Sequence, residues 1–234
     1  CGAVSLNEAV IFNIDEGYDS VARSQLSAVL VKTTSQNYFY IEKGWWDSQV
    51  PAKQSEILGN LGVLSQEFES KIYPTLTSTF GSEWKPGVDG DNKISILFHS
   101  MRDDFGGYFR TVDEYIKLQA PTSNEREILY LATNKIDDLY QLKVLLAHEF
   151  THLITFNQKN KAFDLEDDTW LNEARADYST TVLGYNDNYS SSILRERVRD
   201  FLENSTDSLT EWKDTKYDYA VNSLFTNYLV DHYG

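Results

Sequence analysis

The chain of 234 residues is 41% hydrophobic and 24% charged, which is typical of an ordered globular protein with one large domain or two lobes sharing a core. Its 21 basic and 36 acidic residues give a formal net charge of −15, without any block of lysine or arginine. This charge disfavours nucleic acids and anionic membrane surfaces as partners, because both attract positively charged proteins. The apolar runs are also far shorter than the ~20 residues of a membrane-spanning helix.

The single cysteine of the sequence is its first residue. One thiol cannot form an internal disulfide, and scarcity of cysteine is common in exported bacterial proteins. Cys1 followed by Gly2 allows two interpretations, the lipid-anchored start of a mature lipoprotein or simply the first residue of the sequence. We expect a secreted or surface-located bacterial protein that is monomeric, with the lipid anchor left open.

Residue alternation in the first half of the chain is typical of strands. We expect one hairpin from the first two of these strands and a second hairpin from the last two. The expected strands comprise residues 27–32, 37–41, 93–98, 107–111 and 127–131. Between the hairpins, apolar residues at steps of three and four predict an amphipathic helix from Pro51 that ends near Pro74.

The second half of the chain is predicted to be helical. Residues 137–158 are apolar on much of the helix circumference, which favours a buried central helix. Three further helices should cover residues 168–183, 191–203 and 218–233, with Gly184 and Gly234 as C-terminal stops. The sequence therefore predicts an α+β fold, with a mixed β-sheet lobe (1–158) that ends in the buried helix and a helical lobe (159–234).

The buried helix contains the pentapeptide His148-Glu149-Phe150-Thr151-His152. Residues four apart share one face of a helix, so both imidazoles can bind one metal ion while Glu149 addresses a water on that ion. Such a pentapeptide also occurs by chance, and two core histidines with structural partners are the alternative interpretation.

A second motif follows 21 residues after His152, where Glu173 lies in the sequence Trp-Leu-Asn-Glu-Ala-Arg-Ala-Asp. Two histidines and one glutamate are a known ligand set for catalytic zinc, which keeps a fourth position open. Asp177, one turn beyond Glu173, is placed to accept a hydrogen bond from the non-ligating nitrogen of His148 and so fix its tautomer. The alternative for Glu173 is an ordinary surface carboxylate.

These motifs resemble the gluzincin clan of zinc peptidases, and more closely the hyicolysin-like bacterial neutral metallopeptidases. Ala174 stands where members of that family often have glycine, and this change leaves the ligand beside it untouched. The resemblance extends over most of the chain from about residue 25. It rests on residues 147–154 (AHEFTHLI), 170–173 (WLNE) and 219–225 (YAVNSLF), and less specifically on 123–131.

The resemblance implies a zincin-like fold and a zinc endopeptidase that acts on polypeptides. It assigns His148, His152 and Glu173 as zinc ligands, the same three that the spacing indicates. Glu149 would be the general base that takes a proton from the zinc-bound water and passes it to the leaving amine.

A peptidase also needs a donor that stabilises the oxyanion of the tetrahedral intermediate. Tyr219 is the candidate, because the family pattern often has tyrosine there, and Tyr217 and Tyr185 are the alternatives among fifteen tyrosines. For each of the three, a structural aromatic side chain is the competing interpretation.

Gly107 and Tyr108 are candidate substrate-binding residues, on an edge strand that would pair with an extended peptide. An ordinary hairpin turn explains the glycines equally well.

Calcium is a weaker second cofactor, suggested by residues 89–92 (DGDN) and by 166–168 (EDD), which could instead form a turn and cap the following helix. His99 and His232 are most simply structural.

Two other functional classes remain open. The first is a zincin-fold binding or adhesion module without catalytic activity, although inactivated relatives usually lack the base or a ligand, and none is missing here. The second is a zinc hydrolase with a non-peptide substrate, because the metal chemistry is shared.

Overall fold

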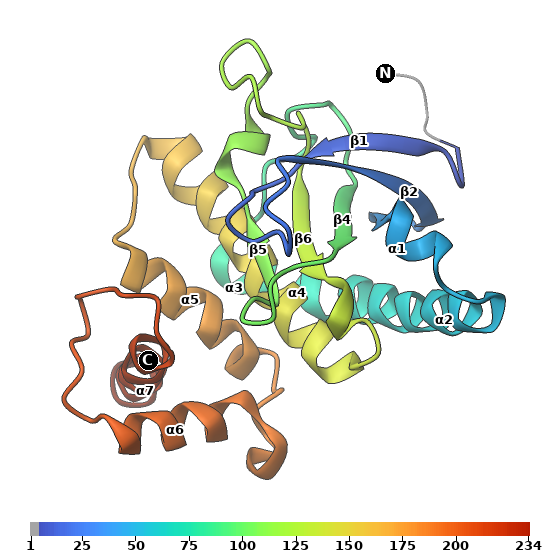
Figure 1. Ribbon diagram of the computed structural model, residues 1–234. Coiled ribbons are helices and arrows are strands. Elements are labelled where there is room, and N and C mark those ends of the chain that lie inside the picture. Colours follow the sequence, from blue (N-terminus) through green and yellow to red (C-terminus); the bar gives the residue numbers. More distant parts are fainter. Residues whose placement is uncertain (1–4) are drawn as a thin grey trace. The chain divides into compact units, whose positions relative to one another are not determined.

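The computed structural model describes residues 5–234, so the predicted anchor at Cys1 lies outside the described residues. The strands are β1 (Ala9–Asn13), β2 (Gln25–Thr33), β3 (Asn37–Glu42), β4 (Ile94–His99), β5 (Gly107–Phe109) and β6 (Ile128–Ala132). The α-helices are α1 (Lys43–Asp47), α2 (Pro51–Glu67), α3 (Tyr73–Phe80), α4 (Leu139–Thr155), α5 (Thr169–Val182), α6 (Ile193–Glu203) and α7 (Lys216–Tyr233). This mixture agrees with the predicted α+β class (Figure 1).

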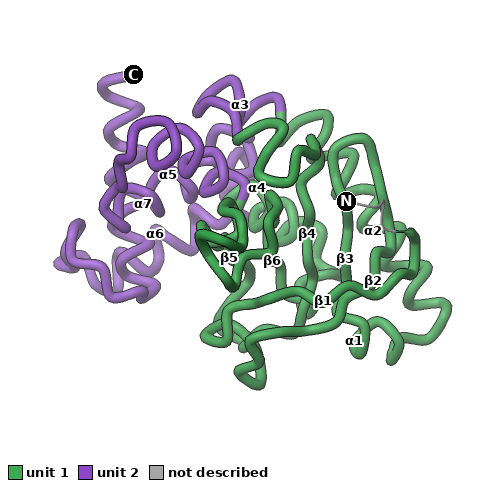
Figure 2. Tube along the Cα trace, turned by 90° about the horizontal axis from the view of Figure 1, so that it is seen from above, with its two compact units in different colours: residues 1–73, 84–149 green, residues 74–83, 150–234 purple. Residues whose placement is uncertain are grey.

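The chain divides into two compact units, which Figure 2 shows in different colours. The first unit comprises the chain up to Tyr73 together with Trp84–Glu149, and it contains the whole sheet. The second comprises Pro74–Glu83 and Phe150–Gly234, and it is helical.

The sheet of the first unit has six strands in the order β1-β2-β3-β4-β6-β5. The three central strands β3, β4 and β6 are parallel to one another, whereas β1, β2 and β5 join antiparallel to their neighbours. Both predicted hairpin pairings are therefore confirmed, β2 with β3 and β5 with β6. In the register of the sheet, Tyr40 lies beside Leu97, Leu97 beside Tyr130, and Tyr130 beside Tyr108.

The two faces of the sheet are covered differently. Every residue of β4 and β6 is buried, as expected for parallel strands covered on both faces. One face carries a core of aromatic and branched side chains that includes Phe12, Tyr40, Leu97 and Tyr130. Helices α2 and α4 lie on one side of the sheet in Figure 1, below it in that view. Burial of each such large side chain contributes about 1.5–3 kcal/mol.

The helix that begins at Pro51 extends beyond its predicted end. A π-helical segment, Phe68–Ile72, follows α2, and α3 continues the helical conformation through Pro74 to Phe80. Proline lacks an N–H and normally disrupts a helix interior. Here the turn just before Pro74 is widened, with the Tyr73 N–H bonding to the Phe68 carbonyl five residues back, which explains how the helix tolerates this proline.

In the second unit, α7 packs against both α5 and α6. Both α5 and α7 carry small buried side chains, Ala176, Ser179 and Ala220. Helix α5 ends where predicted, because Gly184 adopts a φ of +69° and its N–H bonds to the Thr181 carbonyl. A Thr215–Asp218 capping box starts α7.

Two elements were not predicted from the sequence, the edge strand β1 and the five-residue helix α1. Within residues 5–234, no helix combines the length and the apolarity needed to cross a lipid bilayer.

Candidate metal centre

Helix α4 presents its histidines on a narrow accessible face. From Val144 to Thr155, the residues with partial exposure are Leu145, His148 and His152, at steps of three and four, and the others are buried. Steps of this size place the three side chains on one face of the helix. The apolar remainder of α4 thus fixes the helix in place and leaves the two imidazoles accessible.

Glu173 on α5 completes a group of three potential metal ligands with His148 and His152. One ligand atom from each residue lies within 4.8 Å of the others. Two imidazoles and a carboxylate suit zinc by their chemistry, and they leave room for a fourth ligand. Among the described residues, this is the one such group of three or more histidine, cysteine or acidic side chains. These residues could hold a metal ion.

The orientation of His152 is set by a residue whose role the sequence did not reveal. Nδ1 of His152 donates to Oδ1 of Asn172 over 3.2 Å, since an amide oxygen can only accept. Nε2 is then the nitrogen left for a metal, and it faces Oε1 of Glu173 at 3.5 Å. The sequence signal that could have identified Asn172 is its position directly before Glu173.

Polar contacts within the second unit hold α5 against neighbouring segments. Arg175 donates to Thr155 Oγ1 at the end of α4 and to Asp167 just before α5. Asn222 on α7 donates to the Trp170 carbonyl over 2.6 Å. These bonds fix the first turns of α5, where Glu173 lies, relative to α7 and the last turn of α4.

Glu149 lies beside strand β5. Its side chain is buried, with 5% of the residue exposed. A methyl group added at Gly107 would lie 3.0 Å from Glu149 Oε1 and 2.8 Å from the Tyr130 carbonyl, so only glycine permits this approach. Tyr108, by contrast, has its side chain in the core, where its ring stacks on Tyr130 at 4.4 Å. The Tyr108 side chain is therefore enclosed in the core and is not available to a substrate.

Asp177 and Tyr219 are joined through Arg197, a residue that the sequence analysis did not single out. Nε and Nη2 of Arg197 donate to the two Asp177 carboxylate oxygens at 3.1 and 3.0 Å. The guanidinium lies 4.8 Å from the centre of the Tyr219 ring. Although burial favours the neutral form, the Asp177 charge raises the pKa of Arg197 above its usual value. The predicted contact of Asp177 with His148 remains a prediction.

The hydroxyl of Tyr219 donates to Asp214 over 3.3 Å. The alternatives lie elsewhere in the second unit, Tyr217 near the Lys216 ammonium and Tyr185 just after Gly184. The oxyanion-stabilising role of Tyr219, and of its two alternatives, stays a prediction.

The acidic segments considered for calcium have local partners. Asp167 binds Arg175 and Lys159, and Asp168 occupies the N-cap position of α5. In the 89–92 loop, Asp89 and Asp91 accept hydrogen bonds from backbone N–H groups two residues ahead, as in ordinary turns.

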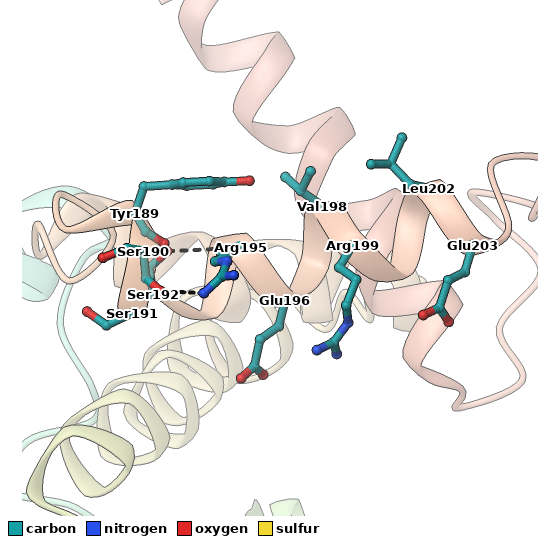
Figure 3. Close-up of a pocket in the computed structure, with 10 residues that line it drawn as sticks. All are labelled: Tyr189, Ser190, Ser191, Ser192, Arg195, Glu196, Val198, Arg199, Leu202 and Glu203. Atoms are coloured by element: carbon teal, nitrogen blue, oxygen red, sulfur yellow. Dashed lines mark hydrogen bonds between the residues drawn. The ribbon is translucent and has the colours of Figure 1, made fainter.

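The second unit also has a separate surface hollow of about 590 Å³ along α6 (Figure 3). Residues 189–192 and the outward face of α6 line it, with the apolar side chains of Tyr189, Val198 and Leu202 beside charged groups. None of its lining residues is a predicted site residue.

No protein-family model matches this chain. The chain is similar to the neutral metalloprotease ShpI of Staphylococcus hyicus, with 33% identity over 207 residues. The aligned region covers 78% of this chain but 43% of that protein, so the chain spans less than half the length of the relative. This similarity supports a metallopeptidase family.

Proposed function

We propose that this chain carries the catalytic machinery of a zinc-dependent endopeptidase of the gluzincin type with a zincin-like fold, secreted by or displayed on a bacterium. The observation that carries the proposal is the convergence of His148, His152 and Glu173. Glu149 directly follows His148 in the sequence, and its side chain is buried. The similarity to a staphylococcal neutral metalloprotease supports it independently.

The donor set fits zinc, with His148, His152 and Glu173 as the residues that would hold it. Asn172 orients the His152 ring for this role. When bound, zinc supplies a Lewis acid that polarises the substrate carbonyl and makes water a stronger acid.

Glu149 is the proposed general base. Its carboxylate takes a proton from the attacking water and then delivers that proton to the leaving amine, so the residue ends the cycle ionised as it began. Burial beside Gly107 keeps the carboxylate at a fixed place near the main chain of β5.

Strand β5 offers a place for the substrate backbone. Ala132 N–H bonds to the Gly106 carbonyl, and in an antiparallel pair the main-chain groups alternate in direction. Tyr108 therefore faces β6, and the N–H and C=O groups of Gly107 and Phe109 point away from it. An extended peptide pairing with those groups would pass next to Glu149.

Two further residues have proposed supporting roles. Asp177 would steady the His148 imidazole, and Tyr219 would donate its hydroxyl to the oxyanion after water attacks. Arg197 contacts both side chains, which supports a shared role for this part of the second unit.

The test is Glu149→Gln, assayed on casein and on a peptide library, with zinc content measured in parallel. We expect zinc binding to persist and kcat to fall about 10²–10⁴-fold, the usual contribution of a general base. Glu166→Gln is the control for the same chemical change elsewhere, because Glu166 is exposed and lies outside the ligand group.

Three outcomes would contradict the proposal. Wild-type turnover in Glu149→Gln would remove its general base. A zinc-loaded wild-type protein that cleaves no peptide would favour a silent binding module. Turnover restricted to non-peptide esters or amides would favour a different zinc hydrolase.

A further inference from the structure

Strand β5 raises a positioning problem. It is three residues long and lies at the edge of the sheet, with β6 as its partner. A short edge strand with one pairing partner has little main-chain hydrogen bonding to hold it. Yet Gly107 approaches Glu149 so closely that even a methyl group would be crowded.

The side chain of Tyr108 connects β5 to a buried polar chain. Its hydroxyl lies 3.1 Å from Nε2 of His99 at the end of β4, and it accepts a hydrogen bond from the Asp15 N–H at 3.3 Å. Nδ1 of His99 faces Asp19 at 3.5 Å, and the side chains of His99 and Asp19 are both fully buried. The Asp19 carboxylate in turn accepts hydrogen bonds from Nε and Nη2 of Arg23.

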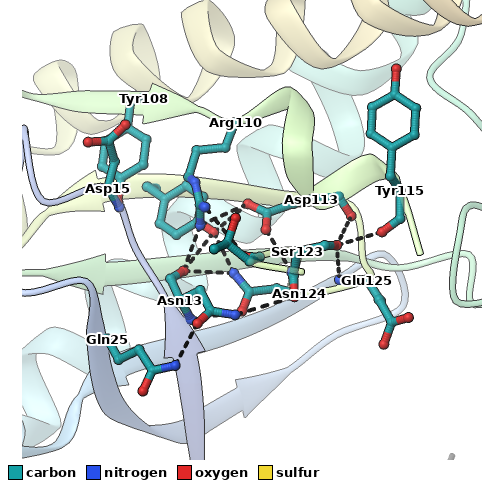
Figure 4. Close-up of polar contacts among 12 residues, drawn as sticks. Asn13, Asp15, Gln25, Tyr108, Arg110, Asp113, Tyr115, Ser123, Asn124 and Glu125 are labelled. Carbon is teal, nitrogen blue, oxygen red and sulfur yellow. Dashed lines mark hydrogen bonds and ion pairs between the residues drawn. The ribbon is translucent and has the colours of Figure 1, made fainter. Parts of the chain in front are cut away.

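Arg110, the residue directly after β5, provides a second connection (Figure 4). Its guanidinium donates to the Asn13 carbonyl at 2.8 Å and lies 3.6 Å from the buried carboxylate of Asp113. The same Asp113 carboxylate accepts from the Tyr130 hydroxyl at 2.6 Å and from the Asn124 N–H at 2.8 Å. The strand is thus tied to β1 and to the segment that precedes β6.

These two connections have different partners but the same mechanical effect. Tyr108 projects into the core from the middle of β5, and Arg110 anchors the chain just beyond its last residue. Neither connection uses the main-chain groups of Gly107, which point away from β6. Buried hydrogen-bonded networks of this kind favour one arrangement, because a displaced strand would leave several buried polar groups unsatisfied.

We propose that Tyr108 and Arg110 are positioning residues that hold β5 against the sheet, so that Gly107 presents its main-chain groups to a peptide substrate beside Glu149. This inference rests on the proposed peptidase function. The two residues touch neither substrate nor reacting atoms, and they act through the placement of the strand.

The first experiment compares Tyr108→Phe with wild type and with Tyr38→Phe. The phenyl ring of the first variant can keep the stacking on Tyr130 but loses the bonds to His99 and Asp15. Tyr38→Phe is the matched control, because it also removes a hydroxyl that is hydrogen-bonded, in this case to the Asp91 carboxylate at 2.9 Å, but on β3. Measurements are hydrogen exchange of peptides spanning residues 105–110, zinc content, and kcat and KM on a peptide substrate.

In Tyr108→Phe, exchange at residues 105–110 should accelerate roughly tenfold, as expected for the loss of a hydrogen bond from a local opening equilibrium. KM should rise by a similar factor while kcat and zinc content stay within about twofold, since the base and ligands are untouched. Tyr38→Phe should change neither β5 exchange nor KM.

A second variant, Arg110→Lys, keeps the positive charge but loses the planar fork of the guanidinium. It should show the same pattern as Tyr108→Phe. Unchanged exchange of β5 in both variants would overturn the proposal, as would faster exchange without a change in KM, or equal effects in Tyr38→Phe. Failure of the peptidase function itself would be seen separately, as wild-type protein that binds zinc and cleaves no peptide.

Discussion

Two histidine–carboxylate pairs in this protein have the same separation and very different surroundings. Nδ1 of His99 lies 3.5 Å from Asp19, and Nε2 of His152 lies 3.5 Å from Glu173. The side chains of the first pair are fully buried, whereas His152 and Glu173 are 10% and 17% exposed.

The remaining partners of each pair decide what it can do. The charge of Asp19 is neutralised by Arg23, and the second nitrogen of His99 is engaged by the Tyr108 hydroxyl. Glu173 has instead a second imidazole, that of His148, within 4.8 Å. The first pair is enclosed in the protein and has Arg23 and Tyr108 as its further partners, whereas the second converges on a point that a cation could occupy. Pair geometry alone therefore does not identify a metal site.

The largest expected effect is a loss of zinc binding when the carboxylate of the second pair is removed, but not when that of the first pair is. Glu173→Ala should lose stoichiometric zinc after dialysis, because two imidazoles alone do not complete the three-ligand set of a catalytic zinc site. Asp19→Asn should retain one zinc per chain. Metal analysis of both variants tests this, and full zinc occupancy in Glu173→Ala would show that another group is the third ligand.

Removal of the Tyr219 hydroxyl should have the next largest effect. Tyr219→Phe is expected to lower kcat about 10²–10³-fold, the range for losing one oxyanion donor, with KM and zinc content nearly unchanged. Steady-state kinetics measures this split. If Tyr217→Phe or Tyr185→Phe shows the loss and Tyr219→Phe does not, the role belongs to that other tyrosine.

A smaller effect should follow from the residue predicted to support His148. Asp177→Asn is expected to reduce zinc affinity or activity about 10–100-fold, as is usual when an indirect partner of a ligating histidine is weakened. Competition with a chelator measures the affinity. Because Arg197 binds the same carboxylate, Arg197→Lys is a useful comparison, and a loss seen there but not in Asp177→Asn would contradict the proposed support of His148.

The smallest effect concerns stability and pH. Burial lowers the pKa of His99 below its usual value of 6.5, so below that pH the unfolded chain takes up a proton that the folded protein resists. This contribution to stability is complete above pH 6.5 and is lost as the pH falls. His99→Gln should remove that part of the slope, measured by urea unfolding from pH 5 to 8.

Glu127 provides a control of opposite sign. Burial raises the pKa of this carboxyl to about 7, so its contribution to stability falls as the pH rises from about 4.5 to 7. Glu127→Gln should remove this fall. A His99→Gln profile parallel to that of wild type would contradict the buried, neutral state of His99.

Features with a short sequence period could be predicted. The boundaries of α5 and α7 were placed to within two residues, because apolar spacing and a terminal glycine are local signals. The ligand group could be proposed because His148 and His152 are four residues apart on one helix, and Glu173 has its own helical pattern. These signals need no knowledge of the rest of the chain.

Features that depend on distant contacts could not be predicted. The hydroxyl of Tyr108 accepts a hydrogen bond from the Asp15 N–H, 93 positions away, and the sequence around Tyr108 does not indicate this bond. Pro74 suggested the end of a helix. The helix instead continues through it, because the π-helical turn that ends just before Pro74 accommodates a residue without an N–H group. Arg197 was overlooked for the same reason, since its partner Asp177 lies 20 residues earlier on another helix.

The aromatic contact between Trp212 and Tyr219 has an optical consequence. The two rings meet edge to face with their centres 4.9 Å apart, so the emission of this indole senses the segment that carries Tyr219. Four other tryptophans also fluoresce, but the difference between the spectra of wild type and Trp212→Phe isolates this one. Binding of a ligand near Tyr219 can therefore be followed through the intrinsic fluorescence of Trp212, without a label and in real time.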